Sequence, residues 1–268
     1  KECQYSNRHP IEVIAFNEEE GNVVGGTFGS KAFAGQPQEE SALQKLAEHG
    51  MCEDDIARSK RNPDDYRCYL ELHIEQGGVL EAEKKQIGIV TSIVGQWGGS
   101  VVLRGKQNHA GTTPMKLRQD PVPVMASFIH DMFSRVKPYE DEMVLTVGKI
   151  ELFPGSVNVI PDRASFTFDI RSASQELGSR AMRMLEELRD KYSKKIEIEI
   201  IPAWEDAPVL LDSTGVRDIE ELCRKLGLSY RIMTSGAGHD SQNMAQVYPT
   251  NVIFVPSEDG VSHDEREF

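Results

Sequence analysis

The order of apolar patterns between Trp97 and Ala203 constrains the fold of this chain more than any other feature. The patterns predict a strand, a helix, two strands, a second helix and a final strand. They cover residues 100–104, 122–136, 143–152, 163–171, 175–192 and 195–202. This β-α-β-β-α-β order is that of the ferredoxin-like fold, which returns the chain close to its entry point and therefore suits a lobe inserted into another domain.

The segments on either side of this region alternate between strand and helix patterns, which indicates a second α/β lobe. The predicted strands cover residues 11–16, 69–75, 230–234 and 251–255. The predicted helices cover residues 39–49, 77–84, 216–225 and 240–247. We therefore predict one α/β lobe made of residues 1–94 and 205–268, interrupted by a smaller lobe of residues 95–204.

The chain carries a net charge of −13 over 268 residues. A surface of that sign repels nucleic acid and anionic membranes, so we expect neither as a partner. No apolar run is long enough to cross a bilayer and the first residues do not resemble a signal peptide, so we expect a cytoplasmic protein. The four cysteines are widely spaced, which argues against a disulfide framework or a thiolate zinc site.

Five clusters of polar residues follow predicted strands or lie in glycine-containing loops. They are residues 17–21, 72–77, 108–115, 235–240 and 260–263. Because buried strands of an α/β lobe end at the rim of a sheet, and such rims bind ligands, these clusters are the candidate functional segments.

Three of the clusters contain residue types that suit a catalytic metal. Glu19 and Glu20 are neighbours in extended chain and point opposite ways, so one carboxylate can face a metal while the other takes a proton from water. Glu20, His73 and His263 form a partial ligand set for zinc or manganese. The alternatives are a solvated acidic loop for the two glutamates and, for His73, a core histidine bonded to a carbonyl.

The remaining clusters suit substrate recognition. His109 lies in an exposed loop and can reach a substrate oxygen, or it is a turn histidine without a catalytic role. Asn158 and Arg171 flank a predicted strand and suit a carboxylate, although Arg171 as a plain surface charge is the competing interpretation. In Gly-His239-Asp240, the carboxylate either orients an imidazole or caps the following helix, and the sequence leaves both open.

Taken in order, these strings resemble a known family. They are Glu-Glu-Gly (19–21), Leu-His-Ile-Glu-Gln-Gly (72–77), Asn-His-Ala-Gly-Thr-Thr-Pro-Met (108–115), Asn-Val-Ile-Pro (158–161), Asp-Ile-Arg (169–171), Gly-Ala-Gly-His-Asp (236–240) and Ser-His (262–263). The chain is similar over nearly its whole length to the hydantoinase/carbamoylase branch of the M20 metallopeptidase-like amidohydrolases. That branch includes N-carbamoyl-L-amino acid hydrolase and allantoate amidohydrolase.

The resemblance implies a metallopeptidase-like α/β lobe with an inserted ferredoxin-like dimerisation lobe that closes over it, in a homodimer. It implies two divalent metal ions per intact subunit, zinc or manganese, with cobalt or nickel also compatible. The roles it carries over are Glu19 as general base, Glu20, His73 and His263 as metal ligands, and Gln76, Asn158 and Arg171 as substrate contacts. His109 resembles the residue lent across the dimer to stabilise an oxyanion, and His239 matches a histidine near the substrate.

The chain also departs from the family pattern. The family's first metal motif, His-x-Asp, and the aspartate that bridges the two ions lie upstream of the acidic cluster, and this sequence begins too late to contain them. The family's Arg-Phe after the acidic motif is replaced by Val23-Val24, and the proline usually found after the last histidine is absent at His263. We therefore expect this chain to be a fragment of a longer polypeptide or a truncated gene product.

The expected activity is hydrolysis of the ureido (carbamoyl) C–N bond of an N-carbamoyl amino acid or allantoate-like acid, a small ureido-acid substrate. One alternative is a catalytically incomplete dimerising fragment. A second is a peptidase or aminoacylase of the wider M20 group, against which the string His-Ile-Glu-Gln-Gly at residues 73–77 counts.

Overall fold

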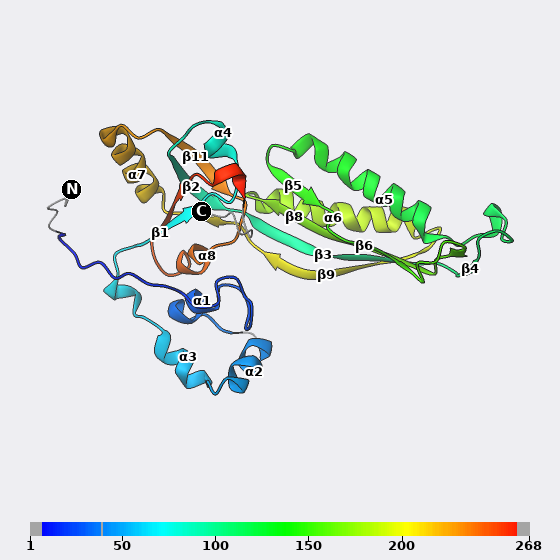
Figure 1. Cartoon of the computed structure of the whole chain (residues 1–268), viewed down its shortest axis with the longest axis horizontal. Coiled ribbons are helices and arrows are strands. Elements are labelled where there is room, and N and C mark those ends of the chain that lie inside the picture. Colours follow the sequence, from blue (N-terminus) through cyan, green and yellow to red (C-terminus); the bar gives the residue numbers. More distant parts are fainter. Residues whose placement is uncertain (1–6, 39, 262–268) are drawn as a thin grey trace.

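A computed structural model of the protein describes residues 7–38 and 40–261. It contains two five-stranded sheets, which we call sheet A and sheet B, and a separate two-stranded ribbon. The strands of sheet B extend away from sheet A, so that the molecule is elongated, and the ribbon lies at the far end (Figure 1).

Sheet B has the strand order and helix cover of a ferredoxin-like fold. It consists of β3 (Gly95–Arg104), β5 (Met143–Thr146), β6 (Ile150–Phe153), β8 (Arg163–Ser172) and β9 (Glu197–Asp206). The order is β5-β8-β3-β9, with β6 also on β8, and every pairing is antiparallel. The helices α5 (Pro121–Val136) and α6 (Gln175–Tyr192) cover one face (Figure 1). The predicted β-α-β-β-α-β order is confirmed.

The strand predicted over residues 143–152 is divided into β5 and β6. Thr146 pairs with Asp169 and Ile150 with Phe166, so three residues stand opposite two on β8. An extra residue on one strand interrupts its ladder, which is why one apolar run gives two short strands.

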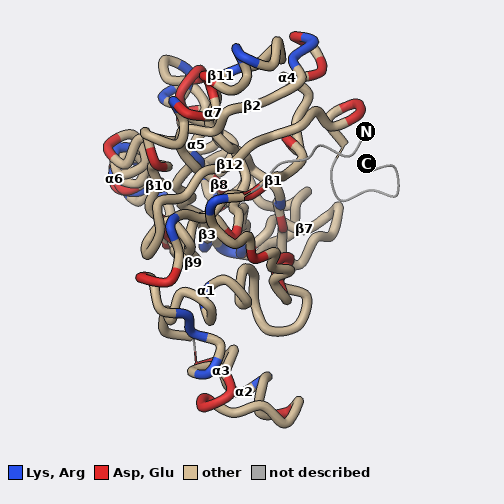
Figure 2. The backbone as a smooth tube through the Cα atoms, turned by 90° about the vertical axis from the view of Figure 1, so that its left-hand side faces the viewer, with Lys and Arg blue, Asp and Glu red and all other residues tan. Residues whose placement is uncertain are grey.

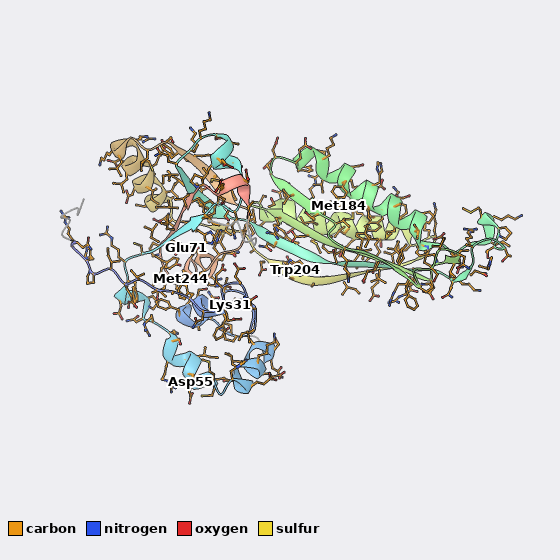
Figure 3. The ribbon with its side chains drawn as sticks, viewed as in Figure 1. Lys31, Asp55, Glu71, Met184, Trp204 and Met244 are labelled. Carbon is orange, nitrogen blue, oxygen red and sulfur yellow. The ribbon has the colours of Figure 1, made fainter. Side chains whose placement is uncertain are left out.

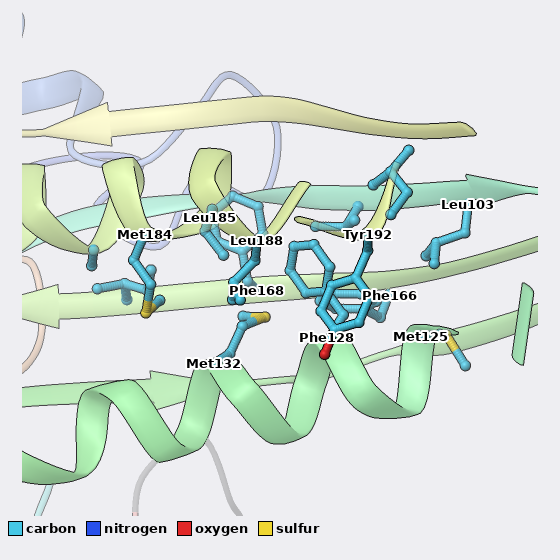
Figure 4. Packing of buried hydrophobic residues seen from close by; sticks show 14 of the residues in the cluster. Leu103, Met125, Phe128, Met132, Phe166, Phe168, Met184, Leu185, Leu188 and Tyr192 are labelled. Atoms are coloured by element: carbon cyan, nitrogen blue, oxygen red, sulfur yellow. The ribbon is translucent and has the colours of Figure 1, made fainter. Parts of the chain in front are cut away.

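The core of this part lies between sheet B and its two helices. Alternate residues of β3 and β8, among them Trp97 and Phe168, are fully buried, as period-2 side chains on one face of a sheet should be. Phe128 and Met132 of α5 and Leu185 of α6 fill the space opposite (Figure 4). The buried side chains from the four elements form one continuous cluster that holds the helices on the sheet.

Sheet A carries the strands that precede the candidate functional segments. It consists of β1 (Tyr69–Ile74), β2 (Ile87–Ile93), β10 (Val209–Leu210), β11 (Tyr230–Ser235) and β12 (Thr250–Val255). β1 and β12 run parallel, β2 is antiparallel to β12 and parallel to β11, and β10 is antiparallel to β2. The strand β2 was not predicted from the sequence, because its residues are largely buried on both faces and lack alternation.

Several short helices and the ribbon complete the described fold. The helices are α1 (Phe28–Ala34), α2 (Glu40–Glu48), α3 (Glu53–Ser59), α4 (Val79–Ala82), α7 (Ser213–Leu226) and α8 (Ser241–Met244). The ribbon pairs β4 (Asn108–His109) with β7 (Val159–Ile160). No helix in residues 7–38 and 40–261 has the length and apolar character of a membrane span. Acidic residues occur on α2, α3, α6 and α7 alike, so the negative charge is not confined to one face (Figure 2).

The prediction of a strand over residues 11–16 is wrong. This segment has no strand partner in the described structure, and the side chains of Ile11 and Val13 are 73% and 91% exposed. Only Ile14 and Phe16 pack, against a cluster that includes Phe33 of α1. An apolar run forms a strand only where it pairs with another strand, and residues 11–16 pair with none in the described structure. The helix α1 was likewise not predicted, because glycines dominate its surroundings.

Candidate active site

Strand β1 presents two potential ligands on one face. Side chains two apart on a strand point the same way, so Glu71 and His73 lie together while Leu70 and Leu72 face the opposite side and are largely exposed. His239 follows β11 and reaches the same place, with its ring centroid 4.6 Å from that of His73. Ligand atoms of Glu71, His73 and His239 all lie within 4.8 Å of one another. Figure 3 shows Glu71 inside the sheet A part of the molecule.

His73 is oriented by its own backbone. Its Nδ1 lies 2.7 Å from the carbonyl oxygen of Ile74, which can only accept, so Nδ1 carries the proton. The lone pair is therefore on Nε2. The core-histidine interpretation requires this hydrogen bond to a backbone carbonyl, and the bond is present. Metal-binding histidines, however, are commonly held in the correct tautomer by a hydrogen bond of the same kind.

His239 is fully buried and has one unsatisfied ring nitrogen. Its Nε2 lies 2.7 Å from Ser235 Oγ, whereas Nδ1 has no hydrogen-bond partner within the described residues and lies 3.7 Å from Glu71 Oε1. Burial, with the nearby His73, lowers the pKa of His239 to about 3. The ring is thus neutral, the form that binds metals, and its orphaned nitrogen faces a carboxylate across a gap that is too long for a hydrogen bond.

Among the described residues, the hydrogen bonds to the Glu71 carboxylate all reach one of its two oxygens. Its Oε2 accepts hydrogen bonds from the backbone nitrogen and the hydroxyl of Ser241, at 3.0 and 2.5 Å, and from the Tyr69 hydroxyl at 3.1 Å. Its Oε1 is the atom nearest His239. A carboxylate and two neutral imidazoles fit a divalent cation such as zinc or manganese. Glu71 was not among the residues predicted from the sequence, although its position two residues before His73 was the available signal.

The three adjacent glutamates of the acidic loop, at positions 18–20, have different roles. Glu18 adopts a left-handed conformation with φ of 58°, and its carboxylate accepts from the backbone nitrogens of Val23 and Val24 at 2.7 and 2.8 Å. These hydrogen bonds lower the pKa of Glu18, which therefore shapes the loop. Glu19 and Glu20 remain the candidates for chemistry, and the charge of Glu19 acts on Asp240, beside the histidines.

Asp240 ties this loop to the histidine segment. It is 7% exposed and accepts a 2.5 Å hydrogen bond from Ser30 of α1, the helix that follows the acidic loop. Asn243 of α8 donates to the same Ser30 oxygen at 2.9 Å. Burial, together with the charges of Glu71 and Glu19, raises the pKa of Asp240 to about 6.

Both sequence interpretations of Asp240 are therefore wrong. The side chain makes no capping bond to α8, and the partners of the His239 ring are Ser235 and, at longer range, Glu71. The carboxylate instead links the segment that carries His239 to α1, since Ser30 and Asp240 are 210 residues apart in the chain.

Glu75 and Gln76 of the His-Ile-Glu-Gln-Gly string (residues 73–77) also have different roles. Glu75 is 9% exposed, and its carboxylate accepts from the backbone nitrogens of Val79 and Leu80 at the start of α4. Gln76 is left-handed with φ of 54°, and its backbone nitrogen donates to Ser257 Oγ at 2.9 Å. A non-glycine residue in this region is strained, and such strain is characteristic of functional turns.

Arg171 joins sheet B to the loop that carries His239. Its guanidinium binds Asp169 through Nε and Nη2, at 2.8 and 3.1 Å, and donates from Nη1 to the carbonyl of Gly236 at 2.9 Å. The bonds to Asp169 raise the pKa of Arg171, so it is always charged. It borders a cavity of about 410 Å³ between the sheets, lined also by Val94, Val144 and Thr234.

His109 and Asn158 lie together but far from the other candidates. The backbone nitrogen of Ala110 donates to the carbonyl of Asn158 at 3.0 Å, and both residues belong to the exposed ribbon region, at the opposite end of the molecule from β1 (Figure 1). His109 Nδ1 accepts from the backbone nitrogens of Gly111 and Thr112. The neutral ring therefore carries its proton on Nε2, as a donor.

Within one chain, then, the structure unites His73 and His239 near Glu19, and places Arg171 at the adjoining loop. It does not bring Asn158 to Arg171, the carboxylate-binding pair predicted from sequence, because Asn158 lies before β7 in the ribbon region, whereas Arg171 lies near the end of β8. His263, the third predicted metal ligand, lies outside the described residues.

Comparison with known proteins gives consistent matches. The model of peptidase family M20/M25/M40 matches residues 1–268. Allantoate amidohydrolase of Escherichia coli is 37% identical over 96% of this chain and 66% of its own length. N-carbamoyl-L-amino-acid amidohydrolase of Paenarthrobacter aurescens is 36% identical over 98% of this chain and 68% of its own length.

Solved structures show the same likeness. The crystal structure of an amidase of the hydantoinase/carbamoylase family from Burkholderia phymatum superposes with a TM-score of 0.82 at 31% identity, over 94% of this chain and 65% of that one. The chain spans about two thirds of the length of the curated relatives that it matches.

Proposed function

Because the chain belongs to peptidase family M20/M25/M40, we propose that the intact protein is a metal-dependent amidohydrolase that cleaves the ureido C–N bond of an N-carbamoyl amino acid or allantoate-like acid. The observation that carries this proposal is the group formed by Glu71, His73 and the neutral, buried His239. The named activities of the relatives, allantoate amidohydrolase and N-carbamoyl-L-amino-acid amidohydrolase, supply the substrate class.

The proposed cofactor is a pair of divalent ions, zinc or manganese, with cobalt or nickel also compatible with oxygen and imidazole ligands. His73 would bind through Nε2, and Glu20 and His263 are the further ligands assigned from sequence. The orphaned Nδ1 of His239 and the Oε1 of Glu71 add two donors that suit the same ions. Bound divalent ions polarise a carbonyl group and lower the pKa of water.

The remaining roles belong to side chains of the protein. In our proposal, Glu19 takes the proton of the attacking water and returns it to the leaving nitrogen, while Arg171 holds the substrate carboxylate and Gln76 contacts the substrate. The buried His239, matched to a substrate contact from sequence, belongs in this proposal to the metal-binding group. The products are ammonia, carbon dioxide and the free amino acid or related acid.

His109 and Asn158 enter the site from a second copy. The Nε2–H of His109 would donate to the carbonyl oxygen as negative charge develops on it, with Asn158 beside it. Their distance from His73 within one chain supports this assignment, and it makes the inserted region, residues 95–204, the dimerisation lobe of a homodimer.

Glu19→Gln tests the proposal in the full-length protein loaded with metal. Turnover of N-carbamoyl amino acids, allantoate and ureidoglycolate is screened first on the wild type. The variant should lose about 10²- to 10⁴-fold in kcat, because the general base is gone, while its metal content by atomic absorption stays unchanged. Glu48→Gln, on exposed α2, is the matched control. Retained turnover in Glu19→Gln would refute the assignment of the base.

A further inference from the structure

Asp169 and Arg171 form a two-pronged ion pair on one face of β8. They are two residues apart on the strand and therefore point the same way. Nε donates to Oδ1 and Nη2 to Oδ2, so the carboxylate occupies the side of the guanidinium group. Arg171 and Asp169 are 33% and 28% exposed, and their cross-strand neighbours on β3 are the uncharged Gln96 and Gly98.

Within residues 7–38 and 40–261, two hydrogens of the guanidinium group have no hydrogen-bond acceptor. Of its five N–H donors, two serve Asp169 and one serves the carbonyl of Gly236. The two that remain are one on Nη1 and one on Nη2. A pair of N–H donors on adjacent nitrogens matches the two oxygens of a second carboxylate.

The anchor on Gly236 sets where that second carboxylate can lie. Gly236 belongs to the loop that leads from β11 to His239, and it lines the same cavity of about 410 Å³ as Arg171. Asp169, on β8 of sheet B, and Gly236, in the loop after β11 of sheet A, thus hold the guanidinium from two directions. Without Asp169 the long side chain would sample several rotamers at a cost in entropy on each binding event.

We propose that Asp169 is a positioning residue: it fixes the guanidinium of Arg171 so that the two remaining N–H groups receive the carboxylate of the substrate. This inference rests on the proposed function. A surface ion pair with a purely structural role would contribute about 0–1 kcal/mol to folding and would not affect substrate choice. The structural role and the positioning role can therefore be distinguished by experiment.

The test compares Asp169→Asn with the wild type in the full-length, metal-loaded protein. The substrates are a ureido acid that the wild type hydrolyses and the methyl ester of the same acid, which lacks the negative charge. We expect KM for the acid to rise about tenfold with kcat within about twofold, and KM for the ester to stay unchanged, because only the acid uses the guanidinium. Asp169→Glu should recover part of the loss, because it restores a carboxylate.

Glu151→Gln is the matched control, since Glu151 pairs with Lys149 on the same sheet at 2.9 Å and should leave both substrates unaffected. Equal effects of Asp169→Asn on acid and ester, or no effect on either, would overturn the positioning role. Calorimetric measurement of acid binding distinguishes a failure of the proposed function from a failure of the positioning role alone. A wild-type protein that neither binds nor hydrolyses any ureido acid contradicts the proposed function. One that does both, while Asp169→Asn keeps its preference for acid over ester, contradicts only the positioning role.

Discussion

The hydrogen bond between Ser30 and Asp240 should contribute to stability in a pH-dependent way. Burial raises the pKa of Asp240 to about 6, above the 3.8 of an ordinary aspartate. The stability that this shift contributes is therefore complete below pH 3.8 and is lost as the pH rises through 6, where the native protein must hold a buried carboxylate. Above pH 6, the Ser30 hydroxyl at 2.5 Å is what stabilises that charge.

Replacing Ser30 with Ala removes this donor. At pH 8 the change should lower the free energy of unfolding by about 3 kcal/mol, because a buried charged acceptor loses its partner. At pH 5 the carboxyl group is mostly protonated in the native state, so the loss should fall to about 1 kcal/mol, that of a neutral hydrogen bond. The difference of about 2 kcal/mol corresponds to a further rise in the pKa of Asp240 in the variant, because its buried carboxylate has lost the Ser30 donor.

The assay is urea unfolding of the metal-free protein at both pH values, for the wild type, Ser30→Ala, Asp240→Asn and the double variant. Asp240→Asn keeps the shape of the side chain and removes its titration. The coupling energy between the two positions should therefore be about 2 kcal/mol at pH 8 and near zero at pH 5. A coupling energy that is the same at both pH values would refute the reasoning, since it would mean that Asp240 does not change its charge in this range.

Two further predictions concern packing and metal. A Cβ at Gly178 in α6 would lie 2.1 Å from the ring of the fully buried Trp97, so Gly178→Ala should lose about 2 kcal/mol of stability although alanine favours a helix by about 1 kcal/mol. Ser179→Ala is the control, and a Gly178→Ala protein as stable as the wild type by urea unfolding would contradict the packing. Zinc or manganese at about a hundred times its Kd should raise the free energy of unfolding by about 2.7 kcal/mol. His73→Ala should abolish most of that increment, and an unchanged increment would remove His73 from the ligand set.

The inserted lobe shows how far sequence patterns reach. The helix predicted over residues 175–192 has the same bounds as α6, because a serine at its start caps Leu177 and its buried residues recur at helical spacing. The strands on either side were predicted because one face is buried and the other exposed, which gives alternation. β2 has no such contrast, since both of its faces are largely buried, and an apolar run alone does not separate strand from helix.

At the candidate active site, sequence patterns selected some of the residues that lie together but not all of their partners. His73 was selected by its position at the end of a strand, and it lies beside His239 and Glu71. Glu71 precedes it by two residues and was overlooked, although alternation alone places both side chains on one face. Arg171 was selected for its charge, but its predicted partner Asn158 lies in the ribbon region next to β7, and the carbonyl that Arg171 contacts is that of Gly236.

The period of each element, and hence which side chains share a face, follows from the sequence, because those relations depend only on neighbours along the chain. The residue types that could bind a metal or a carboxylate were also evident from it. The folded structure was needed to show that Ser30 bonds Asp240, that His239 lies against His73, and that Arg171 donates to Gly236. These contacts join segments far apart in the chain. Two of them depend on how strands and helices assemble around sheet A, and the third on how sheet B lies beside it, which no local pattern encodes.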